Sequence, residues 1–235
     1  MTSDTSTPAP GARRLIPLVI LAALTIASGA TAWLSSRPTV TSTVGPEGVA
    51  IYSVPDLAAA TTTRVGQAVD GITCQSQAKE VVKYHVHIHV SIFVYGREER
   101  LPAGIGITRP ALIEKTSTGD FYDVGLYDCL YWLHTHAADG IIHVEAPARQ
   151  VFTLGEFFDI WRQPLSTRRV GPVTGPVVVF ENGQRRQGDP RDTPLLAHAN
   201  IQIDVGTPVV AYHPFSFTVT GGCGEGTNSC SPSAG

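Results

Sequence analysis

The most regular pattern in the chain is a strict alternation of side chains between Tyr84 and Tyr95. One set of positions is β-branched and apolar, and the other set begins with His85, His87 and His89. Because successive side chains of a strand point to opposite faces, the pattern predicts a β-strand with one buried face. The three histidines are then expected together on the other face, which is either exposed to solvent or lines a binding site.

Similar patterns predict further strands and one clear helix. Residues 130–136 and 141–145 are expected to form a hairpin around the loop 137–140, and residues 177–181 a second hairpin with a turn at Asn182-Gly183. Thr153 and Glu156 form a capping box before an apolar helical stripe, which Pro164 ends. Two further strands are expected over 201–205 and 215–219. We therefore expect a mainly β fold, a sandwich or small barrel of about eight to ten short strands with one or two helices.

The N-terminal segment has the features of a membrane anchor. Arg13 and Arg14 precede residues 15–34, which carry no charge and are long enough to cross a bilayer as a helix. The alternative is a signal peptide cleaved after the small residues at 30–32. Both readings place the rest of the chain outside the cytoplasm, either as a single-pass protein of the cell membrane or as a secreted protein.

The sequence then divides into five regions. These are a cytoplasmic tail (1–14), the transmembrane or signal segment (15–34), a Thr/Ser/Pro-rich spacer (35–70), a β-rich domain (71–220) and a Gly/Cys-rich tail (221–235).

The four cysteines are consistent with an oxidising compartment, where an even number of thiols indicates disulfides. Cys223 and Cys230 lie close together in the tail and are expected to pair, which leaves Cys74 to pair with Cys129. The sequence alone allows three pairings. The formal net charge of −3 shows no basic excess, so nucleic acid is not an expected partner, and no feature identifies a protein partner.

The second group of histidines lies in the expected hairpin. A four-residue loop at 137–140 puts His134 opposite His143, and it puts His136 and Glu145 on the same side of the hairpin. If this hairpin neighbours the strand of His85, the histidines of both elements line one pocket. We therefore predict a transition-metal site to which at least three of six candidate histidines contribute: His85, His87, His89, His134, His136 and His143.

The remaining composition limits which metal ions are expected, and the position of Glu145 suggests a role for its carboxyl. Met1 is the only methionine, so a thioether copper(I) site is excluded, and imidazole ligands favour zinc or copper(II), with iron also allowed. Glu145 is a general base beside a metal-bound water, a fourth ligand, or an ordinary glutamate of the hairpin without a role in the site.

Several of these segments resemble an uncharacterised group of anchored or exported prokaryotic proteins. The resemblance rests on Tyr84-His85-Val86-His87-Ile88-His89, on residues 101–107, on the histidine motif of 133–145 and on the helix at 152–158. It covers roughly residues 71–205 and implies no particular activity.

Three functions fit these features. The first is an extracytoplasmic protein that handles, senses or stores zinc or copper. The second is a metal-dependent enzyme, a hydrolase, hydratase or oxygen-using oxidoreductase, with Glu145 as base or ligand. The third is an accessory subunit of a membrane complex in which the histidines are structural.

Overall fold

The computed structural model describes residues 42–45, 47–60, 66–108, 113–116, 119–122 and 128–217. The expected anchor at 15–34, the tail before it, and the tail that contains Cys223 and Cys230 lie outside these residues. Within the described part of the chain, no helix combines the length and the apolar character that crossing a membrane would require.

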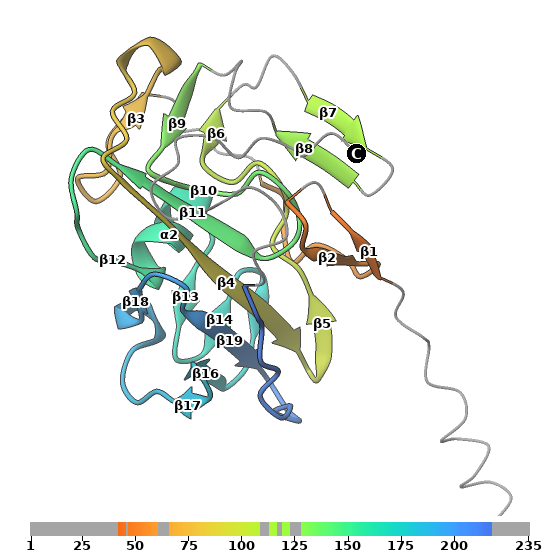
Figure 1. The fold of residues 1–235 in the computed structure, drawn as a ribbon. Coiled ribbons are helices and arrows are strands. Elements are labelled where there is room, and N and C mark those ends of the chain that lie inside the picture. The colour runs from red at the N-terminus through yellow and green to blue at the C-terminus, as the bar shows by residue number, and fades with distance from the viewer. Residues whose placement is uncertain are drawn as a thin grey trace, which may run out of the picture. The chain divides into compact units, whose positions relative to one another are not determined.

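The largest sheet holds the histidine-rich strand near its middle (Figure 1). Its strands follow one another in the spatial order β10 (Leu133–His134), β11 (Ile141–Ala146), β4 (Tyr84–Val94), β19 (Asn200–Val205), β16 (Val177–Glu181) and β17 (Gln184–Arg185). A seventh strand, β5 (Arg97–Glu99), also pairs with β4. The pairing is antiparallel except between β4 and β19, which run parallel.

Smaller sheets and two 3₁₀ turns surround the large sheet. Two of the sheets have three strands each: β3 (Cys74–Gln75), β9 (Cys129–Tyr131) and β6 (Ile107–Thr108); and β13 (Leu165–Ser166), β14 (Arg169–Val170) and β15 (Val173–Thr174). The others are antiparallel pairs: β1 (Ser42–Val44) with β2 (Ala50–Tyr52), β7 (Ile113–Thr116) with β8 (Gly119–Tyr122), and β12 (Phe152–Thr153) with β18 (Pro194–Leu195). The 3₁₀ turns are η1 (Gln77–Lys79) and η2 (Pro190–Asp192).

The fold is mainly β, as the alternating patterns predict, but its architecture is less regular than a sandwich or barrel. In the described residues the strands form several sheets and no closed barrel. The large sheet does not close into a barrel because its two outer strands, β10 and β17, do not pair with each other. The expected strand over 215–219 is not formed in its described part, because residues 211–217 have no regular structure.

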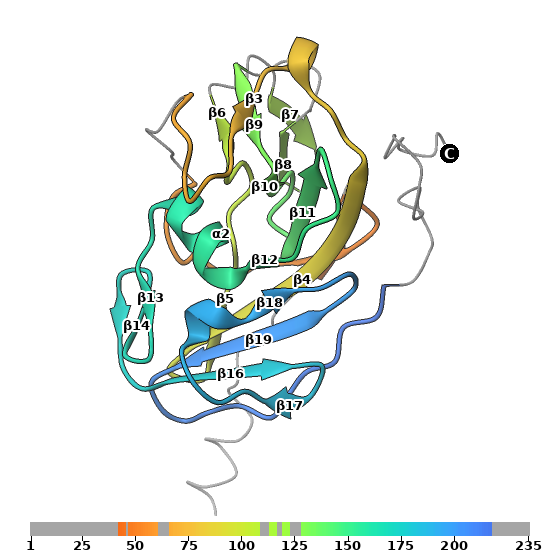
Figure 2. The same cartoon turned by 90° about the vertical axis from the view of Figure 1, so that its left-hand side faces the viewer.

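The single α-helix of the described residues, α2 (Leu154–Trp161), covers one face of the large sheet (Figure 2). Its capping box is confirmed: the Thr153 hydroxyl accepts from the Glu156 backbone N–H, and the Glu156 carboxylate accepts from the Thr153 backbone N–H. Phe157, Phe158 and Trp161 are fully buried in one core with the apolar positions of β4. The histidines of β4 therefore belong to the face opposite the helix.

The core extends into the segment expected to be a spacer. Leu57 and Val69 are buried in the same hydrophobic cluster as Ile88 of β4. The indole N–H of Trp161 also donates to the carbonyl oxygen of Ala59 at 2.9 Å. Residues before Gly71 thus contribute to the packed domain.

A disulfide between Cys74 and Cys129 joins β3 to β9, as the cysteine count predicts. Both cysteines in the described part of the chain are used in this bond. Their thiols are therefore not candidate metal ligands, which leaves the imidazoles and carboxylates.

Candidate metal centre

The register of three neighbouring strands gathers histidines on one face of the large sheet. His134 of β10 lies opposite His143 of β11, as predicted from the loop length. His143 in turn lies opposite His87 of β4, and Glu145 lies opposite His85. Directly paired residues share a face of the sheet, so the assumed adjacency of the two histidine segments is confirmed.

The side chains of this face converge into two groups that share one histidine. In each group, one potential ligand atom from every member lies within 4.8 Å of the others. The first group contains His134, His136, His143 and Glu145, and the second contains His85, His87 and His143. The buried histidine clusters could therefore hold a metal ion.

The hydrogen bonds of His134 and His136 fix which nitrogen of each ring carries the proton. Nδ1 of His134 lies 3.0 Å from the carbonyl oxygen of Tyr131, and Nδ1 of His136 lies 2.8 Å from that of Tyr122. A carbonyl can only accept, so both Nδ1 atoms are protonated donors, and in the neutral rings both Nε2 atoms carry lone pairs. These two Nε2 atoms face each other at 3.1 Å.

Two lone pairs at that separation repel each other unless a cation lies between them. The spacing is close to the ~3.3 Å that separates two ligands of a tetrahedral metal with bonds of ~2.0–2.1 Å. Nδ1–H bonded to a backbone carbonyl, with Nε2 turned to the metal, is also the usual arrangement of a ligating histidine. The pair formed by His134 and His136 is thus arranged as two ligands of one ion.

His143 offers its other nitrogen to the same region. Its Nε2 lies 2.8 Å from Oε1 of Glu47, and Oε1 acting as the acceptor of this contact places the ring proton on Nε2. Its Nδ1 is buried without a hydrogen-bond partner and lies 4.0 Å from Oε1 of Glu145. Nδ1 is therefore the atom of His143 that can bind a metal.

Burial keeps these imidazoles neutral, which is the form that binds metals. It lowers the pKa of His134 and of His143 well below the usual value, and neighbouring histidines lower both further. Burial, with the charges of His85, His198 and His136 as smaller causes, lowers the pKa of His87 to about 3. Burial also lowers the pKa of His85.

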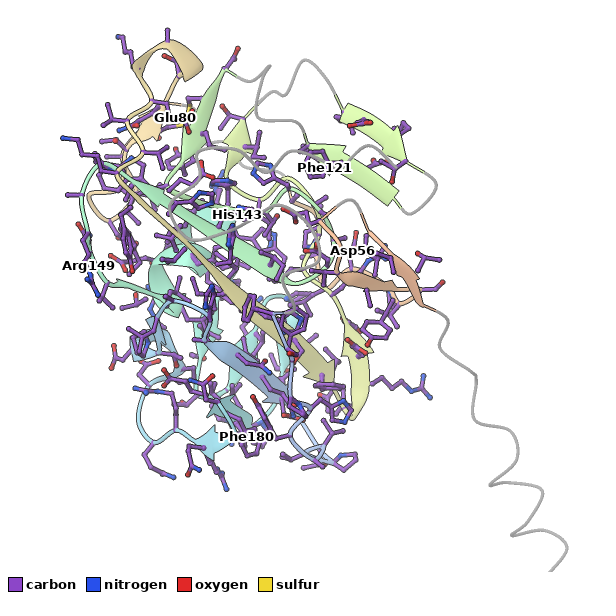
Figure 3. All side chains as sticks on the ribbon, in the orientation of Figure 1. Asp56, Glu80, Phe121, His143, Arg149 and Phe180 are labelled. Carbon is purple, nitrogen blue, oxygen red and sulfur yellow. A yellow bond between two sulfur atoms is a disulfide. The ribbon has the colours of Figure 1, made fainter. Side chains whose placement is uncertain are left out.

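The carboxyl of Glu145 shows the opposite shift for the same reason. Burial, reinforced by the nearby carboxyl of Glu80, raises the pKa of Glu145 to about 7. Figure 3 shows His143 on β11, with Glu80 to one side in that view and Phe121 of β8 to the other. Oε1 of Glu145 lies 3.1 Å from Nε2 of His85.

The histidine face is covered by two hairpins that come from distant parts of the sequence. Glu47 lies in the turn between β1 and β2, where the backbone N–H of Gly45 donates to the carbonyl oxygen of Val49. Tyr122 ends β8, and the ring of Phe121 lies against His136 with centroids 5.5 Å apart. The site is consequently enclosed: His134 is 0% exposed and His143 1%.

His89 shares the alternating pattern but belongs to neither group. It pairs with Ile141 and Asn200 in the sheet, and its ring stacks on Phe215 with centroids 3.8 Å apart. Its Nδ1 lies 3.4 Å from Oδ1 of Asn200. The structure therefore places His89 in a packing role beside the site, while the other five histidines of the prediction converge.

Two acidic residues complete the surroundings. Asp139 is a turn residue, because its Oδ1 accepts from the backbone N–H of Ile141. It also lies near Glu47, and burial together with the Asp139 carboxyl raises the pKa of Glu47 well above its usual value. Glu47 is not among the residues predicted from the sequence, where its only signal is the turn-forming run Gly45-Pro46-Glu47-Gly48.

Comparison of the chain with protein-family models, with curated proteins and with solved structures finds no match. The function is therefore inferred from the sequence and structure of this chain alone.

Proposed function

We propose that this protein holds a resident transition-metal ion through His134, His136, His143 and Glu145. The observation that carries the proposal is the contact between the Nε2 atoms of His134 and His136 at 3.1 Å, with both Nδ1 atoms directed at backbone carbonyls. A cation between the two lone pairs removes the repulsion, and three imidazoles with one carboxylate make a suitable set for zinc or copper(II).

Burial of the ligands favours an ion that stays bound over one that is passed on. A carrier needs a site that its partner can reach, whereas His134 and His143 are almost completely covered. Glu47 holds His143 from behind, and orienting partners of this kind raise metal affinity. We therefore favour a structural or catalytic metal over a transported one.

We further propose that the domain works outside the cytoplasm, held at the membrane by residues 15–34. The apolar run after Arg13 and Arg14 supports this location. The disulfide between Cys74 and Cys129 supports it independently, because such bonds persist in oxidising compartments.

Metal analysis of the purified full chain tests the metal-binding proposal. After exposure to Zn²⁺ or Cu²⁺ and gel filtration, the wild type is expected to retain stoichiometric metal, and His134→Ala and His136→Ala to lose it. His213→Ala is the matched control, since His213 is exposed and outside both groups. Wild-type protein without metal would mean that a shared proton, not a metal, joins the two rings, and the proposal would fail.

A metal-dependent enzyme is the second candidate, favoured by the exposure of one side of the site. The side chains of His85 and Glu145 are 15% and 12% exposed, so small molecules can approach from this side. In a Co²⁺-substituted chain, a catalytic ion with an open position is expected to change its visible absorption when azide is added. An unchanged spectrum at saturating azide would assign the ion a structural role.

A further inference from the structure

The second histidine group is not explained by a single metal ion. Nε2 of His85 and Nε2 of His87 are both buried without a hydrogen-bond partner. His87 is only 9% exposed, so water does not compensate its ring nitrogen well. Buried imidazole nitrogens that lack partners cost stability, which indicates that something absent from a metal-free chain satisfies them.

Glu145 lies between the two groups. It belongs to the first group by its distances, and its Oε1 is also 3.1 Å from Nε2 of His85 and 4.0 Å from Nδ1 of His143. The contact with His85 is close enough for an ion pair if the ring is protonated, but Nε2 of His85 makes no hydrogen bond. Two ligand atoms that approach without a hydrogen bond are arranged as they would be around a common ion. A carboxylate has two oxygens and can bind one ion with each.

The number of ligands also exceeds what one ion needs. The two groups together contain six side chains, because His143 belongs to both. A zinc or copper ion in a protein commonly takes four ligands, so one ion would leave two of these buried side chains unused. Two ions at the ~3.5–4 Å separation of known two-metal sites would use all six.

We propose that the site is dinuclear, with Glu145 as the bridging carboxylate. The first ion is held by His134, His136 and His143, and the second by His85 and His87. This arrangement rests on the proposed function, since it adds a second ion to the first. It leaves the second ion with three protein ligands and one open position for water, on the more exposed side of the site.

Metal stoichiometry and spin coupling in the full chain test the proposal. Chelator-treated protein is titrated with Cu²⁺, separated by gel filtration and analysed for metal and by electron paramagnetic resonance. The wild type is expected to bind two ions per chain, with the half-field signal or the loss of intensity that marks a coupled pair. The double variant His85→Gln/His87→Gln is expected to bind one ion, with the full-intensity spectrum of isolated Cu²⁺.

The outcomes separate this inference from the proposed function. One ion per wild-type chain at saturation would overturn the dinuclear site and leave the single-metal proposal standing. Two ions without coupling would also overturn it, because a bridging carboxylate keeps the ions close. No bound metal would overturn both. His213→Gln is the matched control and should retain two coupled ions, and the wild-type spectrum decides the question even if the double variant does not fold.

Discussion

The carboxyl of Glu47 lies 2.8 Å from Nε2 of His143, although 96 residues separate them in the sequence. Both side chains are buried, with 4% and 1% exposure. Oε1 of Glu47 acting as the acceptor holds the ring proton on Nε2, and the lone pair of Nδ1 then faces Glu145. One turn of the N-terminal hairpin therefore sets the tautomer of a candidate ligand on the central sheet.

Removing this contact should weaken metal binding without unfolding the chain. Glu47→Ala leaves His143 in place but no longer orients it, and loss of such a partner typically lowers metal affinity 10–100-fold. Competition with a chromophoric chelator measures the change. Glu114→Ala, on the exposed part of β7, is the control and should leave the affinity unchanged. Equal affinities in the two variants would show that Glu47 does not orient a ligand.

The candidate ligands from the sheet could be predicted from the sequence, and Glu47 could not. A period of two assigns His85 and His87 to one face, and loop length assigns His134 to His143, because both are local properties of strands. The partner of His143 comes from a turn far away in the chain, and no local pattern encodes such a contact. Periodicity also does not distinguish His89 from the candidate ligands, because His89 shares the alternation but its ring is stacked on Phe215.

The arrangement of strands was less predictable than their existence. The strand patterns at 84–95, 141–145, 177–181 and 201–205 correspond to β4, β11, β16 and β19. Nothing local indicates that β19 pairs with β4 in parallel and separates it from β16. Strand order depends on long-range packing, and the described strands form an open mixed sheet with smaller sheets around it instead of the expected sandwich or barrel.

The metal-free chain should lose stability as the pH falls below neutrality, and His89 should contribute. Burial lowers the pKa of His89 to about 4 in the folded state, and its ordinary pKa of 6.5 applies when unfolded. Between these values the unfolded chain binds more protons, so this contribution is fully present above pH 6.5 and is lost as the pH falls toward 4.

Replacement of His89 by a residue that does not titrate measures that contribution. In His89→Gln, the slope of the unfolding free energy against pH should decrease by about 1 kcal/mol per pH unit within this window. Urea unfolding at a series of pH values, with chelator present, gives the slope. His213→Gln tests whether loss of any histidine has the same effect, and equal slopes in all three proteins would contradict the assignment to His89.

The disulfide should stabilise the domain without affecting the metal. It closes a segment of 55 residues, and the loss of chain entropy in the unfolded state corresponds to about 4 kcal/mol. Cys74→Ser/Cys129→Ser should therefore unfold at lower urea concentration than the wild type. Its metal content should be unchanged, because the ligands come from β4, β10 and β11 and the residues next to them. A cost below about 1 kcal/mol would indicate that the unfolded chain is already restricted in this region.

Gly106 should be essential for the position of His134. Its φ of +75° is unfavourable for other residues, and a Cβ added there would lie 2.4 Å from the Leu133 carbonyl oxygen and 3.1 Å from Cβ of His134. Gly71 provides a matched control, since its φ is +82° but a Cβ there would meet nothing within 4 Å. Both glycines thus have a positive φ, but only at Gly106 would an added Cβ collide with other atoms.

Gly71→Ala should cost only the strain of the left-handed conformation, about 1–2 kcal/mol, and should leave metal affinity unchanged. Gly106→Ala should cost more, because the new methyl group must displace the backbone of β10 at Leu133. That displacement shifts His134 from its position in the site, so metal affinity should fall together with stability. Urea unfolding of the metal-free proteins and chelator competition measure the two quantities separately. If Gly106→Ala binds metal as tightly as Gly71→Ala, the position of His134 does not depend on this close backbone contact.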